Sequence, residues 1–253
     1  MSTPRFDLAP TTRFADRATD YARFRPSYPA SAIDAALEGL PEDPPPVAAD
    51  IGAGTGISSR LLADRGVSVF AVEPNAAMRE SADPHPGVTF LDGTAEATGL
   101  EAASVDVVLC AQAFHWFKPK ESLDEFRRIV KPRGRLVFLV NERDNGDAAM
   151  RAYNAAIKTA AERELSEGMR SSVDDALRAA GIATVPASFP HAQALSRDGL
   201  VGRARSASYV PKDGPRYEQL LRDLDALWTA HRDDDGLVTL GYRTFVWVVE
   251  AAA

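Results

Sequence analysis

The sequence is poor in cysteine, in histidine and in long hydrophobic runs. Its 253 residues include one cysteine, Cys110, which excludes an intrachain disulfide and a cysteine-based metal cluster. The four histidines form no H-x-x-x-H pair, and we therefore expect no bound metal. No apolar run is long enough to span a membrane, and Met1–Pro10 lacks the apolar core of a signal peptide. These absences predict a cytoplasmic protein without a membrane partner.

The sequence also lacks an excess of basic residues. Its formal net charge is −7 at pH 7, whereas a surface that follows a phosphate backbone is normally basic. We therefore expect no nucleic-acid partner and favour a small-molecule ligand, with the chain acting as a monomer or homodimer. Hydrophobic residues make up 45% of the chain, which is enough to form the core of one sizeable α/β domain.

Both common phosphate-binding fingerprints are missing. The third glycine of the dinucleotide motif G-x-G-x-x-G would stand at position 57, which is Ile57, and a P-loop that starts at Gly52 fails at the same residue. Instead, the apolar run Val47–Ile51 leads into an acid-x-G-x-G-x-G pattern over Asp50–Gly56. Glycines allow tight turns and a close approach of a ligand to the backbone, and a helix that starts after them adds free N–H groups. The pattern indicates a small-ligand loop; a glycine-rich turn without a ligand is the alternative.

The rest of the chain alternates between patterns typical of strands and of helices. Such alternation predicts a doubly wound, mostly parallel, Rossmann-like α/β sheet with helices on both faces. Ligands bind to such sheets beyond the carboxyl ends of the strands. Beyond residues 47–51, the predicted strands cover residues 67–72, 88–91, 105–110, 136–140, 189–195 and 239–250. The predicted helices cover residues 31–40 with Ser31 as N-cap, 57–65, 120–130, 147–167, 171–180, 197–208 and 215–231, and a further one starts at Asn75.

Glu73 is the acid that ends the second predicted strand. In strand–helix–strand units, an acid at this place accepts hydrogen bonds from the two hydroxyls of a ribose. No other acid follows that strand before Glu80, and Glu73 is therefore the predicted ribose-binding residue.

Residues 1–28 are polar and interrupted by proline, yet they include five aromatic residues. Disordered tails are poor in aromatics, so this arm is expected to fold onto the rest of the chain, either as packing or as a lid over the ligand. We divide the chain into an arm and helix that cover the site (1–46), a ligand-binding core (47–142), and a C-terminal half of the same domain (143–253). The C-terminal half contributes helices that form an insertion over the site, and the last strands.

Several features occur in the order found in class I S-adenosylmethionine (SAM)-dependent methyltransferases. They are the loop Asp50–Gly56, the acid Glu73, the turn Gly93–Glu96 and the exit of the strand at 105–110. The chain resembles this family over nearly its whole length. The resemblance implies a seven-stranded sheet whose last strand is antiparallel, and a type 11 methyltransferase domain.

Further stretches resemble the trans-aconitate methyltransferase-like branch of that family. They are Arg25–Pro29, His115–Phe117, Arg205–Tyr209 and Tyr242–Phe245. This second resemblance implies a small carboxylic acid as the methyl acceptor.

The family resemblance implies SAM as cofactor and S-adenosylhomocysteine as product. It places the methionine end of SAM at the glycine loop, the ribose on Glu73 and the adenine near Thr94–Glu96. Many relatives have an aspartate where this chain has Thr94, so the adenine contact differs here. The expected cofactor-binding residues are Asp50, Gly52, Ala53, Gly54, Gly56, Glu73, Pro74, Thr94, Ala95, Glu96, Ala111, Gln112 and Tyr28.

A sulfonium methyl group is already electrophilic, so the protein has to align the acceptor and exclude water. A base is needed only where the acceptor carries a proton, as a phenol or alcohol does. His115 is a candidate base, or else it forms the pocket wall with Trp116. The candidate catalytic residues are His115 and Arg25, and the candidate acceptor-binding residues are Tyr21, Arg25, His115, Trp116 and Arg205.

These residues predict methyl transfer from SAM to a small molecule, at a carboxylate oxygen that Arg25 would help to hold. One alternative is a phenol or hydroxyl O-methyltransferase of secondary metabolism that uses His115 as base. Another is a non-catalytic SAM-binding protein. The acidic net charge disfavours a nucleic-acid methyltransferase.

Overall fold

The computed structural model describes residues 23–161, 169–207 and 209–251. Their strands form one seven-stranded sheet in the order β3-β2-β1-β4-β5-β7-β6. Strands β1 to β5 pair in parallel, while β7 pairs antiparallel with β5 and β6. This confirms the predicted doubly wound, mostly parallel sheet with an antiparallel last strand. The strands are β1 (Val47–Ile51), β2 (Ser68–Val72), β3 (Val88–Leu91), β4 (Val105–Ala111), β5 (Val130–Arg143), β6 (Ala187–Leu195) and β7 (Val238–Glu250).

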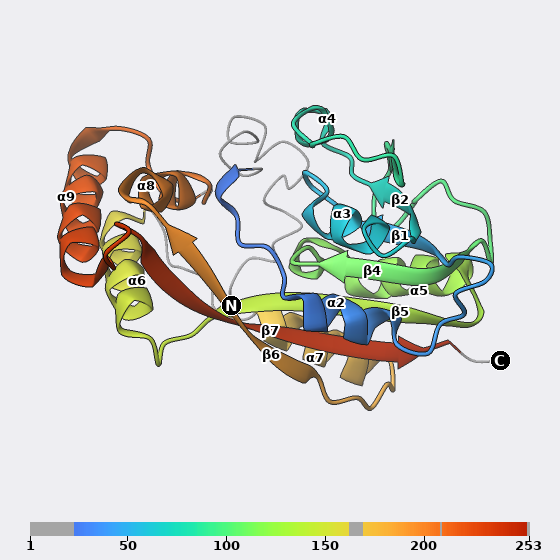
Figure 1. Ribbon diagram of the computed structural model, residues 1–253. Helices are drawn as coiled ribbons and strands as arrows, with labels where there is room; N and C mark the ends of the chain where they lie inside the picture. The colour runs from blue at the N-terminus through green and yellow to red at the C-terminus, as the bar shows by residue number, and fades with distance from the viewer. Residues whose placement is uncertain (1–22, 162–168, 208, 252–253) are drawn as a thin grey trace.

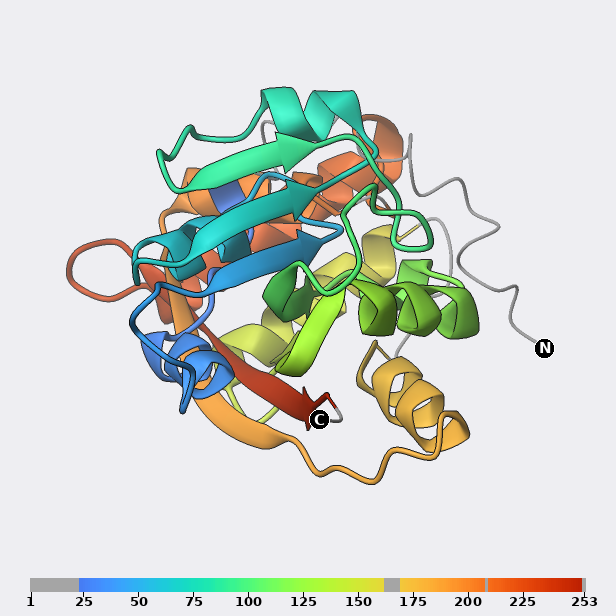
Figure 2. The same ribbon diagram turned by 90° about the vertical axis from the view of Figure 1, so that its right-hand side faces the viewer.

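Helices cover both faces of the sheet (Figures 1 and 2). Apolar side chains of α2 and α3 pack on one face, and those of α5 and α7 pack on the other. The central strand β4 is consequently buried along most of its length, as expected of a parallel strand covered on both sides. The helices are α2 (Ala30–Leu37), α3 (Ile57–Ala63), α4 (Ala76–Glu80), the 3-10 helix η3 (Phe114–Trp116), α5 (Pro119–Ile129), α6 (Ala148–Ala160), α7 (Met169–Ala179), α8 (Arg197–Arg205) and α9 (Gly214–His231).

A second hydrophobic core lies beside the sheet. It is formed by α6, α8 and α9 with the first residues of β7, and it occupies the left of Figure 1. Tyr153, Leu224 and Leu240 are among its buried side chains. Strand β7 is thirteen residues long, so it runs from this helical lobe into the main sheet and joins the two cores.

The strand order fixes where a ligand can bind. From β1 the chain winds toward β2 and β3, and from β4 it winds in the opposite direction toward β5, so β1 and β4 are the neighbours at which the winding reverses. A ligand of such a sheet binds beyond the carboxyl ends of the strands at this switch point. These ends lead directly into Gly52 after β1, Glu73 after β2 and Gln112 after β4.

The structure contradicts one predicted helix start and confirms another. Ser31 is not the N-cap of α2: the helix starts at Ala30 with Pro29 before it, and Ser31 lies exposed in its first turn. The helix ends at Leu37 rather than residue 40, and Gly39 then takes a left-handed φ of 78°. Asn75 does cap α4, since its side chain accepts a hydrogen bond from the backbone of the first turn.

Two boundaries in the middle of the chain were also misjudged. Strand β5 starts at Val130, not Leu136, because Lys131–Gly134 bulge out of a strand that continues on both sides. The bulge needs a left-handed φ of 66° at Arg133. Helix α6 ends at Ala160, before the predicted residue 167, because the next residue has an extended ψ of 134°.

The described residues contain no helix that is both long and apolar enough to cross a membrane. Within these same ranges, no group of three or more histidine, cysteine, aspartate or glutamate side chains is arranged to hold a metal ion.

Trp247 offers a test of the main core. It is fully buried on β7, and its Nε1 donates a hydrogen bond of 2.9 Å to Asp174 on α7. Trp247→Ala should lower the free energy of unfolding by about 3–5 kcal/mol, because it leaves a cavity and an unpaired acid. Urea unfolding measures the loss. The control Val185→Ala, at a side chain 88% exposed, should stay within about 0.5 kcal/mol of the wild type.

Candidate active site

The loop after β1 turns on three glycines with left-handed backbone angles. Gly52, Gly54 and Gly56 have φ values of 69°, 59° and 73°, a region that favours glycine. A Cβ atom on Gly52 would also lie 2.6 Å from the Cβ of Ala113 and 2.9 Å from the ring of Phe117. The glycine pattern of the sequence is therefore required both by the turn and by the aromatic loop that packs on it.

Glu73 joins this loop to the end of β2. One carboxylate oxygen accepts a hydrogen bond of 3.0 Å from the backbone N–H of Gly54, and the other accepts one of 2.9 Å from that of Asn75. The side chain is 9% exposed, and burial raises its pKa, against the lowering effect of these bonds. Each oxygen keeps a second lone pair, so the carboxylate can still accept two further hydrogen bonds.

Asp50 lies beneath the loop. Its carboxylate is fully buried and accepts hydrogen bonds of 2.6 Å from the hydroxyls of both Ser58 and Ser59, in the first turn of α3. Burial raises its pKa to about 6, although the two serine bonds act in the opposite direction. Within the described structure, Asp50 thus fixes α3 to β1 and the glycine loop from below. The role of the two serines was missed, because a serine pair after a glycine loop carries no distinctive spacing.

The exit of β4 is strained and tied to the neighbouring strand. Gln112 has a left-handed φ of 56°, which is uncommon for a residue other than glycine. Its amide nitrogen donates a bond of 3.0 Å to the backbone oxygen of Asn141 at the end of β5. Asn141 is buried and donates in turn to the backbone oxygen of Ser27 at 2.9 Å. This chain of bonds connects β4, β5 and the segment before α2.

His115 and Trp116 follow in the 3-10 helix η3. Both side chains are half-buried, and their ring centroids are 4.9 Å apart. Because Ala113 and Phe117 on either side of them contact Gly52, this helix stands directly beside the glycine loop. The structure therefore brings His115 to the part of the sheet edge where the sequence analysis expected the methyl group.

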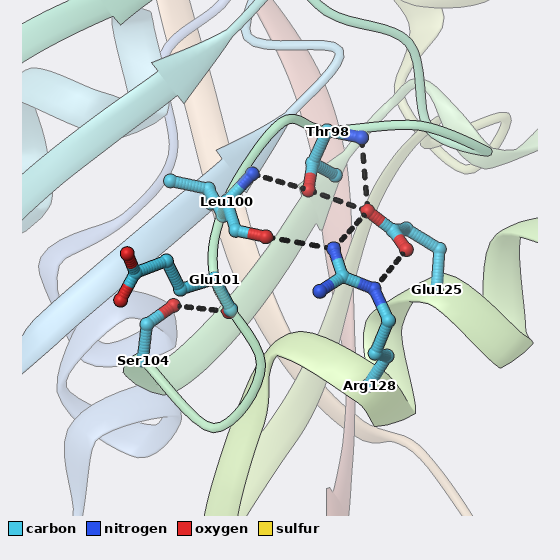
Figure 3. A network of polar contacts seen from close by, with 6 residues as sticks. All are labelled: Thr98, Leu100, Glu101, Ser104, Glu125 and Arg128. Atoms are coloured by element: carbon cyan, nitrogen blue, oxygen red, sulfur yellow. Dashed lines mark hydrogen bonds and ion pairs between the residues drawn. The ribbon is translucent and has the colours of Figure 1, made fainter.

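The turn after β3 is anchored to α5 (Figure 3). Glu125 accepts bonds from the backbone N–H and the hydroxyl of Thr98, at 2.9 and 2.6 Å. Arg128 pairs with Glu125 and also donates to the backbone oxygen of Leu100 at 2.7 Å. The Arg128 guanidinium holds the pKa of Glu125 down to about 2. Glu96 is held as well, since it accepts from the backbone N–H of Lys118 at 2.9 Å.

The segment before α2 lies against α8. Arg25 donates a bond of 3.0 Å to the backbone oxygen of Ser206, and the ring of Phe24 fills the space over Gly202, where a Cβ would come within 2.3 Å of it. Figure 1 shows this segment running up beside α8. Arg205, in the last turn of the same helix, is exposed.

The predicted site residues differ in exposure. Tyr21 lies outside the described residues. Thr94 and Arg205 are exposed. The half-buried residues are Arg25, Gly52, Pro74, Glu96, Ala111, Gln112, His115 and Trp116. The buried residues are Tyr28, Asp50, Ala53, Gly54, Gly56, Glu73 and Ala95.

Solved structures of methyltransferases share this fold. A protein of Anaeromyxobacter dehalogenans designated a type II methyltransferase superposes with a TM-score of 0.66 and 25% identity, over 90% of this chain and 99% of that chain. A protein of Anabaena variabilis designated a methyltransferase of an antibiotic biosynthesis pathway superposes with a TM-score of 0.58 and 24% identity, over 90% and 100% of the two chains.

The sequence of the core agrees with this fold. Residues 49–138 match the family model described as a methyltransferase domain. This stretch, which runs from β1 into β5, is therefore similar to a methyltransferase domain. An uncharacterized methyltransferase of Mycobacterium tuberculosis is 41% identical over 136 residues, which are 52% of this chain and 53% of that protein. An uncharacterized methyltransferase-like protein of Schizosaccharomyces pombe is 36% identical over 134 residues, 52% of each chain. The chain thus spans about half the length of the curated relatives it matches.

The residues around the glycine loop fit SAM, the methyl donor that the sequence analysis predicts. A ribose presents two adjacent hydroxyls, and Glu73 keeps one free lone pair on each oxygen. Four buried polar atoms around the loop have no hydrogen-bond partner among the described residues: Asp50 Oδ1, Thr55 Oγ1, Asn75 Nδ2 and Gln112 Oε1. Buried polar groups normally have partners, so these atoms suit a polar ligand.

The buried carboxyl of Asp50 predicts a pH dependence of stability. Its pKa is about 6 in the folded protein, against 3.8 for an ordinary aspartate. Between these values the unfolded chain releases its proton first, so the free energy of unfolding falls as the pH rises. This loss in the free energy of unfolding, about 3 kcal/mol in total, is absent below about pH 4 and complete above about pH 6.

Urea unfolding at several pH values checks this expectation. Relative to the wild type, Asp50→Asn should gain about 3 kcal/mol of stability between about pH 4 and pH 7, because an amide does not titrate there. Asp234→Asn, which changes an exposed acid, should show no such pH-dependent difference. A constant difference between Asp50→Asn and the wild type would contradict the assignment.

Proposed function

We propose that this chain is a SAM-dependent methyltransferase that acts on a small molecule, at a carboxylate oxygen. The observation that supports it most directly is Glu73, a buried carboxylate fixed between two backbone N–H groups at the end of β2 with two lone pairs left to accept. This arrangement suits a ribose beside the glycine loop. The match of the core to a methyltransferase domain supports the same conclusion.

Each part of the cofactor has a proposed position along the sheet edge. Glu73 and the adjoining Pro74 would receive the ribose, and Gly52–Gly56 the methionine end. The turn at Thr94–Glu96 would receive the adenine, with Glu96 holding the turn through its bond to Lys118. Ala111 and Gln112 would face the middle of the cofactor, since β4 neighbours β1 in the sheet.

The acceptor would lie over the carboxyl ends of β4 and β5. When bound, SAM supplies a methyl group on a positively charged sulfur, which an acceptor oxygen can attack without prior activation. A carboxylate carries no proton at neutral pH, so the protein has to position it and exclude water. Arg25 would position it through its guanidinium, and His115 and Trp116 would form the wall.

A second candidate is methyl transfer to a phenol or alcohol, favoured by the position of His115. This half-buried side chain stands on η3, whose neighbouring residues contact Gly52. A hydroxyl acceptor loses a proton in the reaction, and a histidine at this place is suited to accept it. Under this alternative His115 is a base rather than part of the wall.

Replacing Glu73 tests the cofactor site. Glu73→Ala should weaken S-adenosylhomocysteine binding by about 10- to 100-fold, because it removes two hydrogen bonds to a charged group. Titration calorimetry measures this loss. Glu101→Ala changes an exposed acid in the turn before β4, at the other end of the strands, and should leave the affinity unchanged. Equal affinity of Glu73→Ala and the wild type, or binding of NADH without SAM, would refute the site.

Two variants and one pH profile distinguish the acceptors. The assay measures S-adenosylhomocysteine formed with a panel of carboxylic acids and phenols. For a carboxylate acceptor, Arg25→Ala should strongly lower kcat/KM, whereas His115→Gln should cost about tenfold through pocket shape alone. Arg23→Ala, on the exposed neighbouring arginine, is the control.

The hydroxyl alternative gives the opposite pattern. His115→Gln should then lower the rate by about 10²–10⁴-fold and abolish a limb of the pH profile near the histidine pKa. That combined result would overturn the carboxylate proposal. Binding of SAM without turnover of any tested acid or phenol would favour a non-catalytic SAM-binding protein.

A further inference from the structure

Arg203 is a buried cation without a buried anion. It projects from α8 and is 4% exposed. Its guanidinium donates to the hydroxyls of Tyr242, at 3.3 Å, and of Ser206, at 3.5 Å. Among the described residues, no carboxylate lies within ion-pair distance of it. A buried charge is costly unless it is paired, so this arrangement calls for an anion.

Arg143 brings a second guanidinium to the same place. It stands at the end of β5, opposite Tyr242 in the β5–β7 register. Its nitrogens donate to the side-chain oxygen of Asn154 and to the hydroxyl of Tyr209, both at 2.8 Å. Its guanidinium also lies 5.5 Å from the ring centre of Tyr153. Its hydrogen-bond partners in the described structure are therefore neutral.

One of the tyrosines beside these arginines has a hydroxyl without a hydrogen-bond partner. Tyr153 is fully buried, and its hydroxyl has no hydrogen-bond partner in the described parts of the chain. Burial alone would raise the pKa of Tyr209, but the nearby Arg143, Arg203 and Arg25 outweigh it and lower that pKa. The positive charge of these arginines therefore favours a negative charge on an oxygen placed among them. We call Arg143, Arg203, Tyr153, Tyr209 and Tyr242 the arginine–tyrosine cluster.

The cluster adjoins the proposed acceptor position. Gln112, at the exit of β4, bonds to the backbone of Asn141, which precedes Arg143 by two residues on β5. Residues two apart on a strand point to the same face, about 7 Å from one another. On the other side, Arg25 bonds to Ser206 just beyond α8. Figure 1 shows α6, α8 and β7 meeting in this part of the molecule.

We propose that the arginine–tyrosine cluster binds a carboxylate of the acceptor that is not the one methylated. This rests on the proposed function. A planar guanidinium matches a carboxylate with two parallel hydrogen bonds, and the free hydroxyl of Tyr153 adds a donor. A carboxylate that accepts hydrogen bonds from two arginines and a tyrosine has fewer free lone pairs than one that Arg25 alone positions, so the reacting oxygen belongs to another group. Because the cluster adjoins the proposed acceptor position along β5, the ligand we propose is a short dicarboxylate.

Titration calorimetry of the full chain with S-adenosylhomocysteine present tests the proposal. The probes are succinate, glutarate and adipate, each compared with the monocarboxylate of the same length. At least one dicarboxylate should bind about 10- to 100-fold more tightly than the monocarboxylate of the same length, because its second carboxylate accepts charge-assisted hydrogen bonds. If no dicarboxylate binds more tightly than its monocarboxylate, the proposal is wrong.

Variants assign the preference to the cluster. Arg143→Gln and Arg203→Gln should each reduce dicarboxylate binding about 10- to 100-fold, and Arg203→Lys should be weakened as well because it loses the planar fork. Arg243→Gln, on the exposed side of β7, is the matched control and should bind as the wild type does. Equal affinity in wild type and both glutamine variants would overturn the proposal.

Tyr153→Phe separates binding from folding. Its hydroxyl bonds to none of the described residues, so the variant should unfold in anion-free buffer at the wild-type temperature or above. The dicarboxylate should nevertheless bind about 2- to 10-fold less tightly and raise the unfolding temperature less. Unchanged dicarboxylate binding in this variant would count against the cluster even if Arg203→Gln fails to fold. Loss of S-adenosylhomocysteine binding by the wild type would instead refute the methyltransferase proposal.

Discussion

The hydrogen bonds of the Glu73 carboxylate are the interaction on which the proposed cofactor site depends. They join the glycine loop after β1 to the start of α4 through a side chain that ends β2. Each bond uses a backbone N–H that would otherwise be buried and unpaired, so the carboxylate fixes two loops at once. The same carboxylate retains the lone pairs that suit a ribose. One side chain therefore both builds the edge of the site and, in our proposal, binds the ligand.

The glycine loop is also held from below, by a second set of hydrogen bonds. Asp50 is buried behind the loop and held by two serine hydroxyls, at the cost of a pKa raised to about 6. Gly52 leaves no room for a Cβ against the loop that carries His115. Preorganised polar groups of this kind stabilise a charged reactant without having to rearrange when it arrives. A fixed loop also sets the distance between cofactor and acceptor, on which an in-line transfer depends.

The proposed acceptor site shows the opposite balance of charge. The proposed cofactor site is formed around carboxylates, whereas the helical lobe brings Arg143 and Arg203 together with neutral partners. A cofactor with a positive sulfur and an acceptor with negative carboxylates would each meet the opposite charge. This division follows from the fold: β2 and β1 deliver the acids to one end of the edge, and β5 and β7 lead into the lobe at the other.

The sequence by itself determined the local features: the alternation that gives the sheet, the glycine spacing that requires left-handed angles, and Glu73 at a strand end. These depend on residues close together in the chain. Only the tertiary structure showed that Asp50 supports the loop from below, and that Arg203 rather than the exposed Arg205 is the buried arginine of α8. Nearby positions on a helix face different directions, and the hydroxyl to which Arg203 donates belongs to Tyr242 of β7, which is 39 residues away in the chain. The spacing of residues along the chain does not predict such contacts between distant segments, so only the tertiary structure could show them.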